Sequence, residues 1–203
     1  EAGKKVLVID IDPQGNTTSG LGINKKKLKE TVYEMMLGEC TLEECKAKSC
    51  MKNLFVLPSD VDLAGAEIEL IGVDNREFIL KKLIDPVRDQ YDFIIIDCPP
   101  SLGLLNTNAL TAADSVLIPI QCEYYALEGV TQLLLTIRLV QQLFNPNLVI
   151  EGALLTMYDA RTKLSLEVQQ NVRKHFKEKV YRNYIPRNVK LSESPSHGKT
   201  IFE

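Results

Sequence analysis

The 203-residue chain has no hydrophobic run long enough to cross a bilayer and no stretch that resembles a signal peptide. It has a formal net charge of only -3, so the chain as a whole does not attract nucleic acid, and DNA binding would need a local basic patch. No Gly-x-Gly-x-x-Gly follows an apolar run, which argues against a dinucleotide-dependent redox enzyme. These absences favour a cytoplasmic protein without membrane association.

Histidine is also scarce, and this bears on the five cysteines. Cys40, Cys45 and Cys50 are regularly spaced, but zinc ligands usually lie two to four residues apart and four are needed. His175 and His197 are far away in the sequence. We therefore interpret the three cysteines as free thiols in a reduced compartment.

Strand-like and helical patterns alternate along the chain, and this alternation predicts βαβ units. The expected strands are Lys5 to Ile11, Leu54 to Leu57, Phe93 to Ile96, Val116 to Ile120 and Leu148 to Thr156. The expected helices are Leu63 to Ile71, Glu77 to Tyr91, Leu104 to Ala113, Leu127 to Phe144 and Leu164 to Phe176. The predicted fold is α/β, with a mostly parallel sheet and helices on both faces, in a single domain over residues 1–203.

Two of the apolar runs stop at carboxylates and continue into turn residues. The first run leads to Asp10 and Asp12 and the second to Asp97. Ligands of parallel sheets bind beyond the carboxyl ends of the strands, so both runs direct acidic groups to one edge. A hydrated Mg²⁺ with a phosphate needs only one or two protein carboxylates there. Taken alone, Asp12 fits a capping role in the following turn equally well.

The residues after Asp97 strengthen this interpretation. Pro99 and Pro100 stiffen the exit from the strand and remove two backbone donors. Such a segment suits a loop whose position depends on a bound phosphate. An apolar strand that ends in aspartate is also the arrangement by which nucleotide hydrolases hold magnesium through water.

Four motifs together are far more specific than any one of them. They are Asp-x-Asp-Pro-Gln-Gly-Asn at 10–16, Ile-Asp-Cys-Pro-Pro-Ser-Leu-Gly at 96–103, Pro-Ile-Gln-Cys-Glu-Tyr-Tyr-Ala-Leu-Glu-Gly at 119–129, and Ile-Pro-Arg-Asn-Val-Lys-Leu-Ser-Glu-Ser-Pro-Ser-His-Gly-Lys at 185–199. In this order, over nearly the whole chain, they resemble the ParA/Soj family of DNA-partitioning ATPases.

The resemblance implies a deviant Walker-type P-loop ATPase that uses ATP and Mg²⁺. In the family, ATP is held between two subunits of a sandwich dimer, the dimer binds DNA without sequence preference, and a ParB-type partner stimulates hydrolysis. The expected role is chromosome or plasmid partitioning in the bacterial cytoplasm, in association with the nucleoid.

Matched position by position, the resemblance also implies residue roles. Asp12 is the carboxylate needed for hydrolysis, and Asp97 and Asp12 are the groups near magnesium, which they contact through water. Pro186 and Arg187 border the adenine. The remaining matches are Arg161 and Lys190, which supply basic DNA contacts.

One departure bears on activity. The family's Gly-rich phosphate-binding loop and first strand precede the first motif and are not in this sequence. In the fold, that strand lies between the strands that end at Asp97 and Ile120, so its absence exposes two strand edges. We expect a fragment that lacks the P-loop and the C-terminal helix, and that is inactive alone.

Three functions stay open at this level. The first is a truncated partition ATPase. The second is a non-catalytic remnant that contacts only DNA or a partner. The third is a membrane-associated division-site ATPase, which fits less well because Asp12 is followed by Pro-Gln-Gly-Asn. The short basic run Lys25–Lys27 is interpreted as solvated surface.

Overall fold

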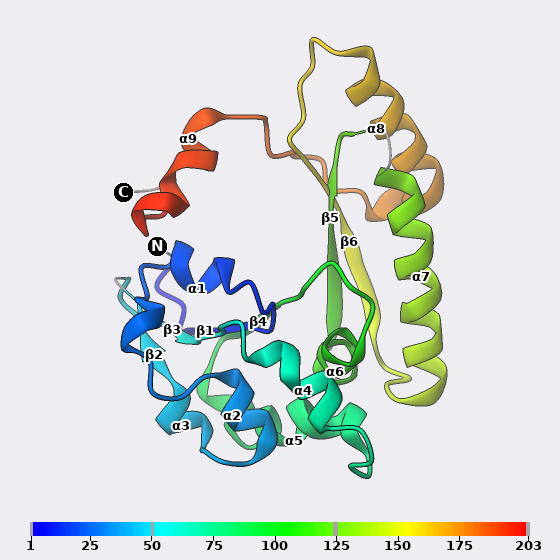
Figure 1. Cartoon of the computed structure of the whole chain (residues 1–203). Coiled ribbons are helices and arrows are strands. Elements are labelled where there is room, and N and C mark those ends of the chain that lie inside the picture. The colour runs from blue at the N-terminus through cyan, green and yellow to red at the C-terminus, as the bar shows by residue number, and fades with distance from the viewer. Residues whose placement is uncertain (1, 50, 124–125, 202–203) are drawn as a thin grey trace. The chain divides into compact units, whose positions relative to one another are not determined.

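The computed structural model describes residues 2–49, 51–123 and 126–201. The chain forms two compact units (Figure 1). Unit 1 extends to Ala112 and includes the chain again from Ser192, and unit 2 comprises Ala113–Leu191. Each unit is described by itself below. The single domain expected over residues 1–203 stays a prediction.

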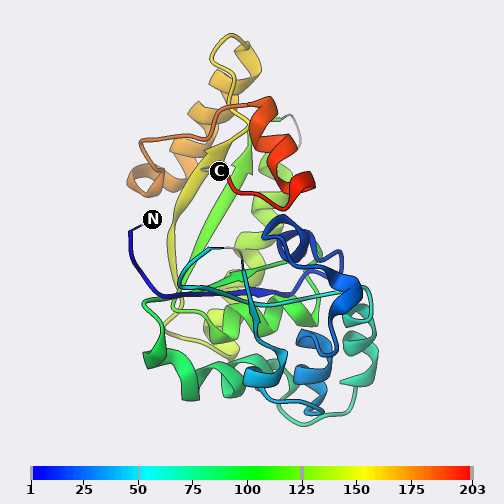
Figure 2. The same cartoon turned by 90° about the vertical axis from the view of Figure 1, so that its left-hand side faces the viewer.

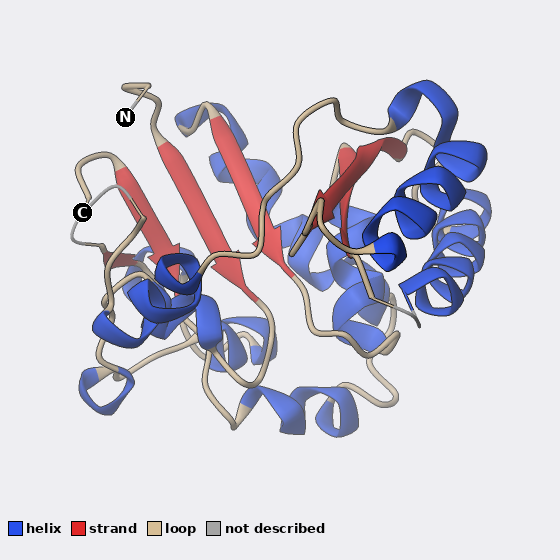
Figure 3. Ribbon diagram, turned by 90° about the horizontal axis from the view of Figure 1, so that it is seen from above, coloured by secondary structure: helices blue, strands red, loops and turns tan. Residues whose placement is uncertain are grey.

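Unit 1 is built on a four-stranded sheet with the order β2-β3-β1-β4. Its parallel strands are β1 (Val6–Asp10), β3 (Leu54–Leu57) and β4 (Phe93–Asp97), and Figure 3 shows them side by side. The two-residue strand β2 (Ala47–Lys48), which the sequence pattern did not indicate, pairs antiparallel with β3 at the edge. The α/β class and the mostly parallel sheet are confirmed.

Helices of unit 1 supply much of the core that covers this sheet. They are α1 (Asn16–Gly20), α2 (Val32–Leu37), α3 (Leu42–Cys45), α4 (Leu63–Glu69), α5 (Ile79–Ile84) and α6 (Leu104–Ala112). Leu7 and Ile9 of β1 belong to the core, together with buried side chains such as Met35, Leu63 and Leu80. Capping boxes at Thr31 and Thr41 fix the starts of α2 and α3, because each threonine and the glutamate three residues later satisfy otherwise unpaired backbone N–H groups.

The helix predicted over Glu77 to Tyr91, with Pro86 expected to shape or kink it, is broken into three segments. The chain forms a short 3-10 helix (Arg76–Phe78), then α5, then a second 3-10 helix (Asp85–Gln90). Pro86 explains the break after α5, because proline lacks the N–H that would continue the helical hydrogen bonds. Proline is well tolerated in the first turn, and here it lies in the first turn of the second 3-10 segment.

Unit 2 contains a two-stranded parallel sheet of β5 (Ser115–Gln121) and β6 (Val149–Thr156), which run side by side in Figure 2. Helices α7 (Ala126–Leu143) and α8 (Lys163–Phe176) pack against these strands. A 3-10 helix (Lys177–Lys179) follows α8, and α9 (Val189–Glu193) begins in unit 2 and ends after the boundary at Ser192. The 3-10 helix at Ser194–His197 belongs to unit 1.

Within the described residues, β4 pairs only with β1 and β5 pairs only with β6, so each has one side without a strand partner. Apolar side chains on them reach solvent, with Phe93 57% exposed, Ile95 53% and Leu117 47%. Phe93 and Ile95 alternate with less exposed residues along β4, so only one face of this strand is packed.

The packing in unit 1 gives a stability prediction. Ile9→Ala removes a fully buried side chain from the central strand and should lower the free energy of unfolding by about 2–5 kcal/mol. Urea unfolding monitored by circular dichroism measures the change. The matched control is Ile68→Ala on α4, where the side chain is 71% exposed and little change is expected. Equal losses in both variants would contradict the assignment of this core.

Candidate functional site

Asp10 ends the central strand as a fully buried carboxylate. Its Oδ2 accepts hydrogen bonds from the Thr18 backbone N at 2.8 Å and Thr18 Oγ1 at 2.7 Å, and its Oδ1 accepts from Asp12 N at 3.2 Å. Thr18 Oγ1 in turn accepts from the backbone N of Ser59, just beyond β3. Burial raises the pKa of Asp10, and the bonds from Thr18 and Asp12 oppose that rise. One side chain therefore ties together the ends of β1 and β3 and the start of α1.

Asp12 lies in the tight turn that follows. The backbone N of Gly15 donates to Asp12 O at 2.8 Å, and the backbone N of Gln14 donates to Asp12 Oδ1 at 2.9 Å. Gly15 has φ +57°, and a Cβ there would approach Ser59 O to 2.6 Å, so this turn requires glycine. The Asp12 carboxylate is half-buried. Its position in the turn fits the capping alternative, and its remaining oxygen is left for another role.

Asp97 ends the neighbouring strand, in register with Asp10. Thr17 Oγ1 donates to Asp97 Oδ2 at 2.7 Å, so the segment after Asp12 holds this carboxylate. Asp12 lies two residues beyond Asp10, so its turn leaves β1 at the same end of the sheet as Asp97. The structure thus brings Asp12 and Asp97 to one edge of the sheet, as the sequence predicted.

A side chain of α6 forms hydrogen bonds with the Pro-Pro loop that follows β4. The side-chain amide of Asn106, 7% exposed, donates to Pro99 O at 2.9 Å and to Ser101 O. Lys25 contacts the other loop at this edge, donating from Nζ to Gln14 O at 2.5 Å. The Lys25–Lys27 run is a 3-10 helix, and its first lysine helps to build the Asp12 turn.

In unit 2, the segment that carries Pro186 and Arg187 runs beside the end of β6. Tyr158 N donates to Ile185 O at 3.1 Å and Arg187 N donates to Tyr158 O at 3.0 Å, forming a parallel bridge between Tyr158 and Pro186. The Tyr158 and Tyr184 rings pack at 4.2 Å between centroids. The predicted adenine segment and the Arg161 loop are therefore hydrogen-bonded neighbours.

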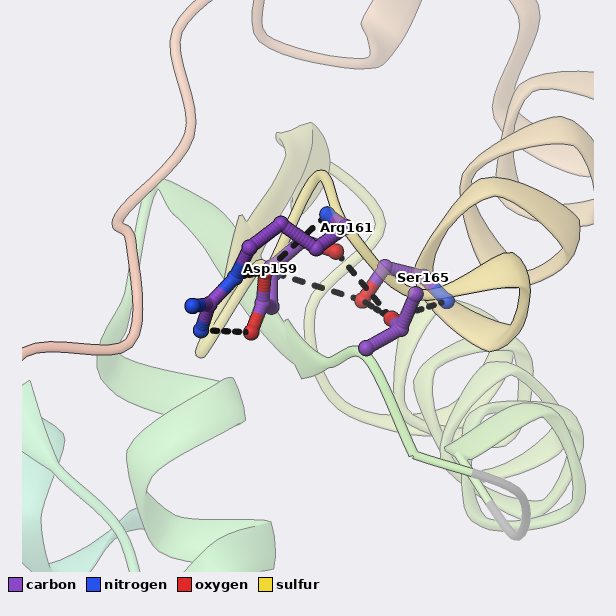
Figure 4. Close-up of polar contacts among 4 residues, drawn as sticks. Asp159, Arg161 and Ser165 are labelled. Atoms are coloured by element: carbon purple, nitrogen blue, oxygen red, sulfur yellow. Dashed lines mark hydrogen bonds and ion pairs between the residues drawn. The ribbon is translucent and has the colours of Figure 1, made fainter.

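Arg161 forms an ion pair with Asp159 (Figure 4). Arg161 Nε donates to Asp159 Oδ1 at 2.9 Å and Nη2 donates to Oδ2 at 2.7 Å, so the contact is bidentate. The Arg161 side chain is 89% exposed, and that of Asp159 only 20%. Hydrogen bonds from the side chain and backbone of Arg161 lower the pKa of Asp159 to about 2.

The other predicted basic residues also have partners. Arg187 Nη2 donates to Glu123 Oε1 at 3.0 Å. Lys190 is exposed at the start of α9, where its backbone N donates to Asn188 Oδ1 at 2.8 Å.

Sequence reasoning missed four groups that support the predicted residues. Thr17, Thr18 and Asn106 are neutral residues whose hydrogen bonds join separate segments, with partners 80, 8 and 7 residues away. Asp159 offered a signal that was overlooked, because a carboxylate two residues before a loop arginine can pair with it locally.

Cysteine and metal-ligand patterns add no site in the described part of the chain. Cys45 is buried and Cys40 half-buried, both as free thiols, and the Cys50 prediction lies outside the described residues. Within 2–49, 51–123 and 126–201, no group of three or more His, Cys, Asp or Glu side chains is arranged to hold a metal ion. None of the helices over the same residues is both long enough and apolar enough to span a membrane.

A mostly parallel α/β fold with carboxylates at the ends of adjacent strands is the architecture of P-loop nucleotide hydrolases. A sequence model for a family described as an AAA domain matches residues 1–150. The Bacillus subtilis sporulation initiation inhibitor protein Soj is 57% identical over 200 residues, which cover 98% of this chain and 79% of Soj. Chromosome partitioning protein ParA of Myxococcus xanthus is 52% identical, over 99% of this chain and 71% of that protein. The chain belongs to the Soj/ParA family of chromosome-partitioning ATPases.

Solved structures agree with the fold. A Mycobacterium smegmatis protein named cobyrinic acid a,c-diamide synthase, with bound ADP and magnesium, superposes with a TM-score of 0.86 at 40% identity, over 97% of this chain and 78% of that chain. A Cyanothece McdA variant in complex with ATP superposes with a TM-score of 0.90 over 99% of this chain and 79% of that chain. Its identity of 21% supports the fold alone.

The buried contacts of Asp10 give the second prediction. Asp10→Ala leaves the Thr18 and Asp12 backbone donors without their acceptor and should lower the free energy of unfolding by about 2–5 kcal/mol. Chemical denaturation measures this loss. Asp89→Ala, at an exposed carboxylate of the same unit, should be near neutral. An Asp10→Ala protein as stable as the parent would show that this network does not hold the site together.

Proposed function

We propose that this protein is an ATP-dependent partition protein that acts on bacterial chromosomal DNA. In this proposal, it hydrolyses ATP with Mg²⁺, binds DNA of any sequence as an ATP-bound homodimer, and responds to a ParB-type partner in the cytoplasm at the nucleoid. One observation carries it: Asp12 and Asp97 share one sheet edge in a chain 57% identical to Soj. The chromosomal cargo follows from the relatives' names.

The carboxylate edge of unit 1 fits a magnesium nucleotide. Bound Mg²⁺ would neutralise charge on the phosphates. Asp97 would hold a magnesium-bound water, and the hydrogen bond from Thr17 Oγ1 that fixes its carboxylate supports this role. Asp12, which accepts from the backbone N of Gln14 with one oxygen, would orient the attacking water with the other.

Pro186 and Arg187 are proposed to border the adenine. Pro186 has no backbone donor, and the Arg187 N–H is occupied by Tyr158 O, so the Pro186 side of this stretch offers an exposed apolar ring and no free backbone N–H. The Arg187–Glu123 ion pair links this segment to the loop after β5. Glu123 belongs to the third motif, so two motifs meet here within unit 2.

Hydrolysis gives the third prediction, for the protein expressed from its complete gene. Asp12→Ala should lower ATP turnover by about 10²-fold or more, because it removes a positioned carboxylate, while ATP binding stays largely intact. Phosphate release and calorimetric ATP titration measure the two quantities. Asp74→Ala, an exposed carboxylate outside this edge, is the control. Parental turnover in Asp12→Ala would refute the catalytic role.

ATP turnover, measured together with DNA binding and vesicle binding, separates the other candidate functions. A non-catalytic remnant would show no ATP turnover with or without Asp12, yet would still bind DNA or a partner. A membrane-associated relative would bind anionic vesicles in the ATP state and leave DNA unbound. Neither alternative is supported by a specific contact in the described residues.

DNA binding is proposed to involve Arg161 and Lys190, both exposed in unit 2. Their chain segments adjoin, because the loop after β6 pairs with the segment that leads into α9. Two cations per subunit give about four phosphate contacts in a dimer and a log–log salt slope of about -3.6.

Replacing both cations is the fourth prediction. The Arg161→Ala/Lys190→Ala protein should bind duplex DNA of every sequence more weakly and with a flatter salt dependence, because fewer counterions are released. Fluorescence anisotropy at several salt concentrations measures both effects, and light scattering confirms that ATP-dependent dimers persist. Unchanged affinity at all salt concentrations would place the DNA contacts elsewhere, with Lys26 and Lys27 the next residues to test.

A further inference from the structure

The Asp159–Arg161 pair has a geometry that an arginine reaching freely into solvent does not have. Asp159 Oδ1 accepts from both the backbone N and Nε of Arg161, at 3.0 and 2.9 Å, and Oδ2 accepts from Nη2 at 2.7 Å. The Asp159 carboxylate therefore binds both the guanidinium and the backbone N–H of Arg161. Only one of the two bidentate edges of the guanidinium, the Nε–Nη2 edge, is used.

The second bidentate edge, between Nη1 and Nη2, makes no hydrogen bond to any residue that the structure describes. Because the Arg161 side chain is 89% exposed, this edge is open to solvent. Two parallel N–H groups at this spacing match two oxygens of a phosphate. Arg161 can thus contact a phosphate without leaving Asp159.

The support behind Asp159 is itself ordered (Figure 4). Its backbone N donates to Ser165 Oγ at 3.3 Å, and its carbonyl accepts from Thr162 Oγ1 at 3.0 Å. Thr162 caps α8 by accepting from Ser165 N at 3.2 Å, and Ser165 is 2% exposed. The loop is thereby anchored to a 14-residue helix, so the Asp159 carboxylate has a fixed base.

We infer that Asp159 is a positioning residue for DNA binding: it holds the Arg161 guanidinium with its outer edge directed at a backbone phosphate. This rests on the proposed role of Arg161 in binding DNA. Ordering a long side chain on binding costs free energy, and Asp159 reduces that cost by ordering it beforehand. Because the pKa of Asp159 is lowered, the pair is intact above the ordinary value of 3.8 and is lost only as the pH falls toward about 2.

The alternative effect of Asp159 has the opposite sign. A carboxylate beside the arginine could instead compete with phosphate and neutralise its charge. Removing such a competitor would raise DNA affinity and steepen the salt dependence. The Arg161 charge would then be available to neutralise a DNA phosphate and release the counterions bound there. Removing a positioning residue lowers affinity at every salt concentration and leaves the slope unchanged, because the same phosphate is still contacted.

Asp159→Asn in the protein expressed from its complete gene tests the inference. With ATP present, we expect duplex DNA affinity to fall about 3- to 10-fold, the cost of immobilising one long side chain, with the salt slope unchanged. The matched control is Glu167→Gln, which removes the same charge from an exposed position on α8 and should not weaken binding. Higher affinity in Asp159→Asn would overturn the inference.

A double-mutant cycle separates positioning from a general structural effect. In an Arg161→Ala background, Asp159→Asn should change DNA affinity by less than about twofold, because there is no guanidinium left to orient. Arg161→Lys should behave similarly, since an ammonium cannot use two edges. A full loss in these backgrounds would show that Asp159 acts through the fold of the loop, against the inference.

A readout in the absence of DNA completes the test. The Arg161 Nε–H should be ordered on the nanosecond timescale in the parent protein and mobile in Asp159→Asn, as measured by ¹⁵N relaxation. If Arg161→Ala leaves DNA affinity unchanged, the proposed DNA role of Arg161 fails, and this inference with it. If Arg161→Ala weakens binding but Asp159→Asn does not, only the inference fails.

Discussion

A buried carboxylate at the end of the central strand is the contact on which the rest of unit 1 depends. Asp10 is fully buried, yet it is surrounded by donors from two segments, and its pKa is raised by burial. Such a group is costly unless its lone pairs find donors, and here Thr18 and Asp12 supply them. Through Thr18 the same network reaches Ser59 after β3. The hydrogen bonds of Asp10 and Thr18 thus connect the turn that contains Asp12 to the buried ends of β1 and β3.

The arrangement separates residues that hold the site from residues that could act in it. Asp10 and Thr18 are buried and satisfied, so they contribute to stability. Asp12 and Asp97 are half-buried at the sheet edge, and each has an oxygen that the described side chains leave available. The two acidic residues of the first motif therefore have different duties, although they are only two positions apart in the sequence.

Local patterns were enough to predict most of the fold. Strand-like runs rich in apolar residues identified β1, β3, β4, β5 and β6, and those of β1 and β4 are apolar without interruption up to a carboxylate, as in parallel sheets. Short elements escaped prediction: α2 and α3 are too short to show apolar periodicity, and β2 is two residues long. The capping boxes that begin α2 and α3 are local signals that the sequence does contain. For the candidate site, the sequence was enough to predict which aspartates lie at the strand ends. The hydroxyl and amide groups that orient them could not, since their partners lie up to 80 residues away, as Thr17 does from Asp97.

The bridge between Tyr158 and Pro186 has a consequence for how the two proposed ligands influence each other. The segment proposed to border adenine is hydrogen-bonded on both sides of Pro186 to the residue next to Asp159. If nucleotide displaced that segment, the displacement would reach the Arg161 loop through two backbone hydrogen bonds and the Tyr158–Tyr184 ring contact. Coupling of this kind is reciprocal by thermodynamic necessity. If bound nucleotide raises the affinity for DNA, bound DNA raises the affinity for nucleotide by the same free energy.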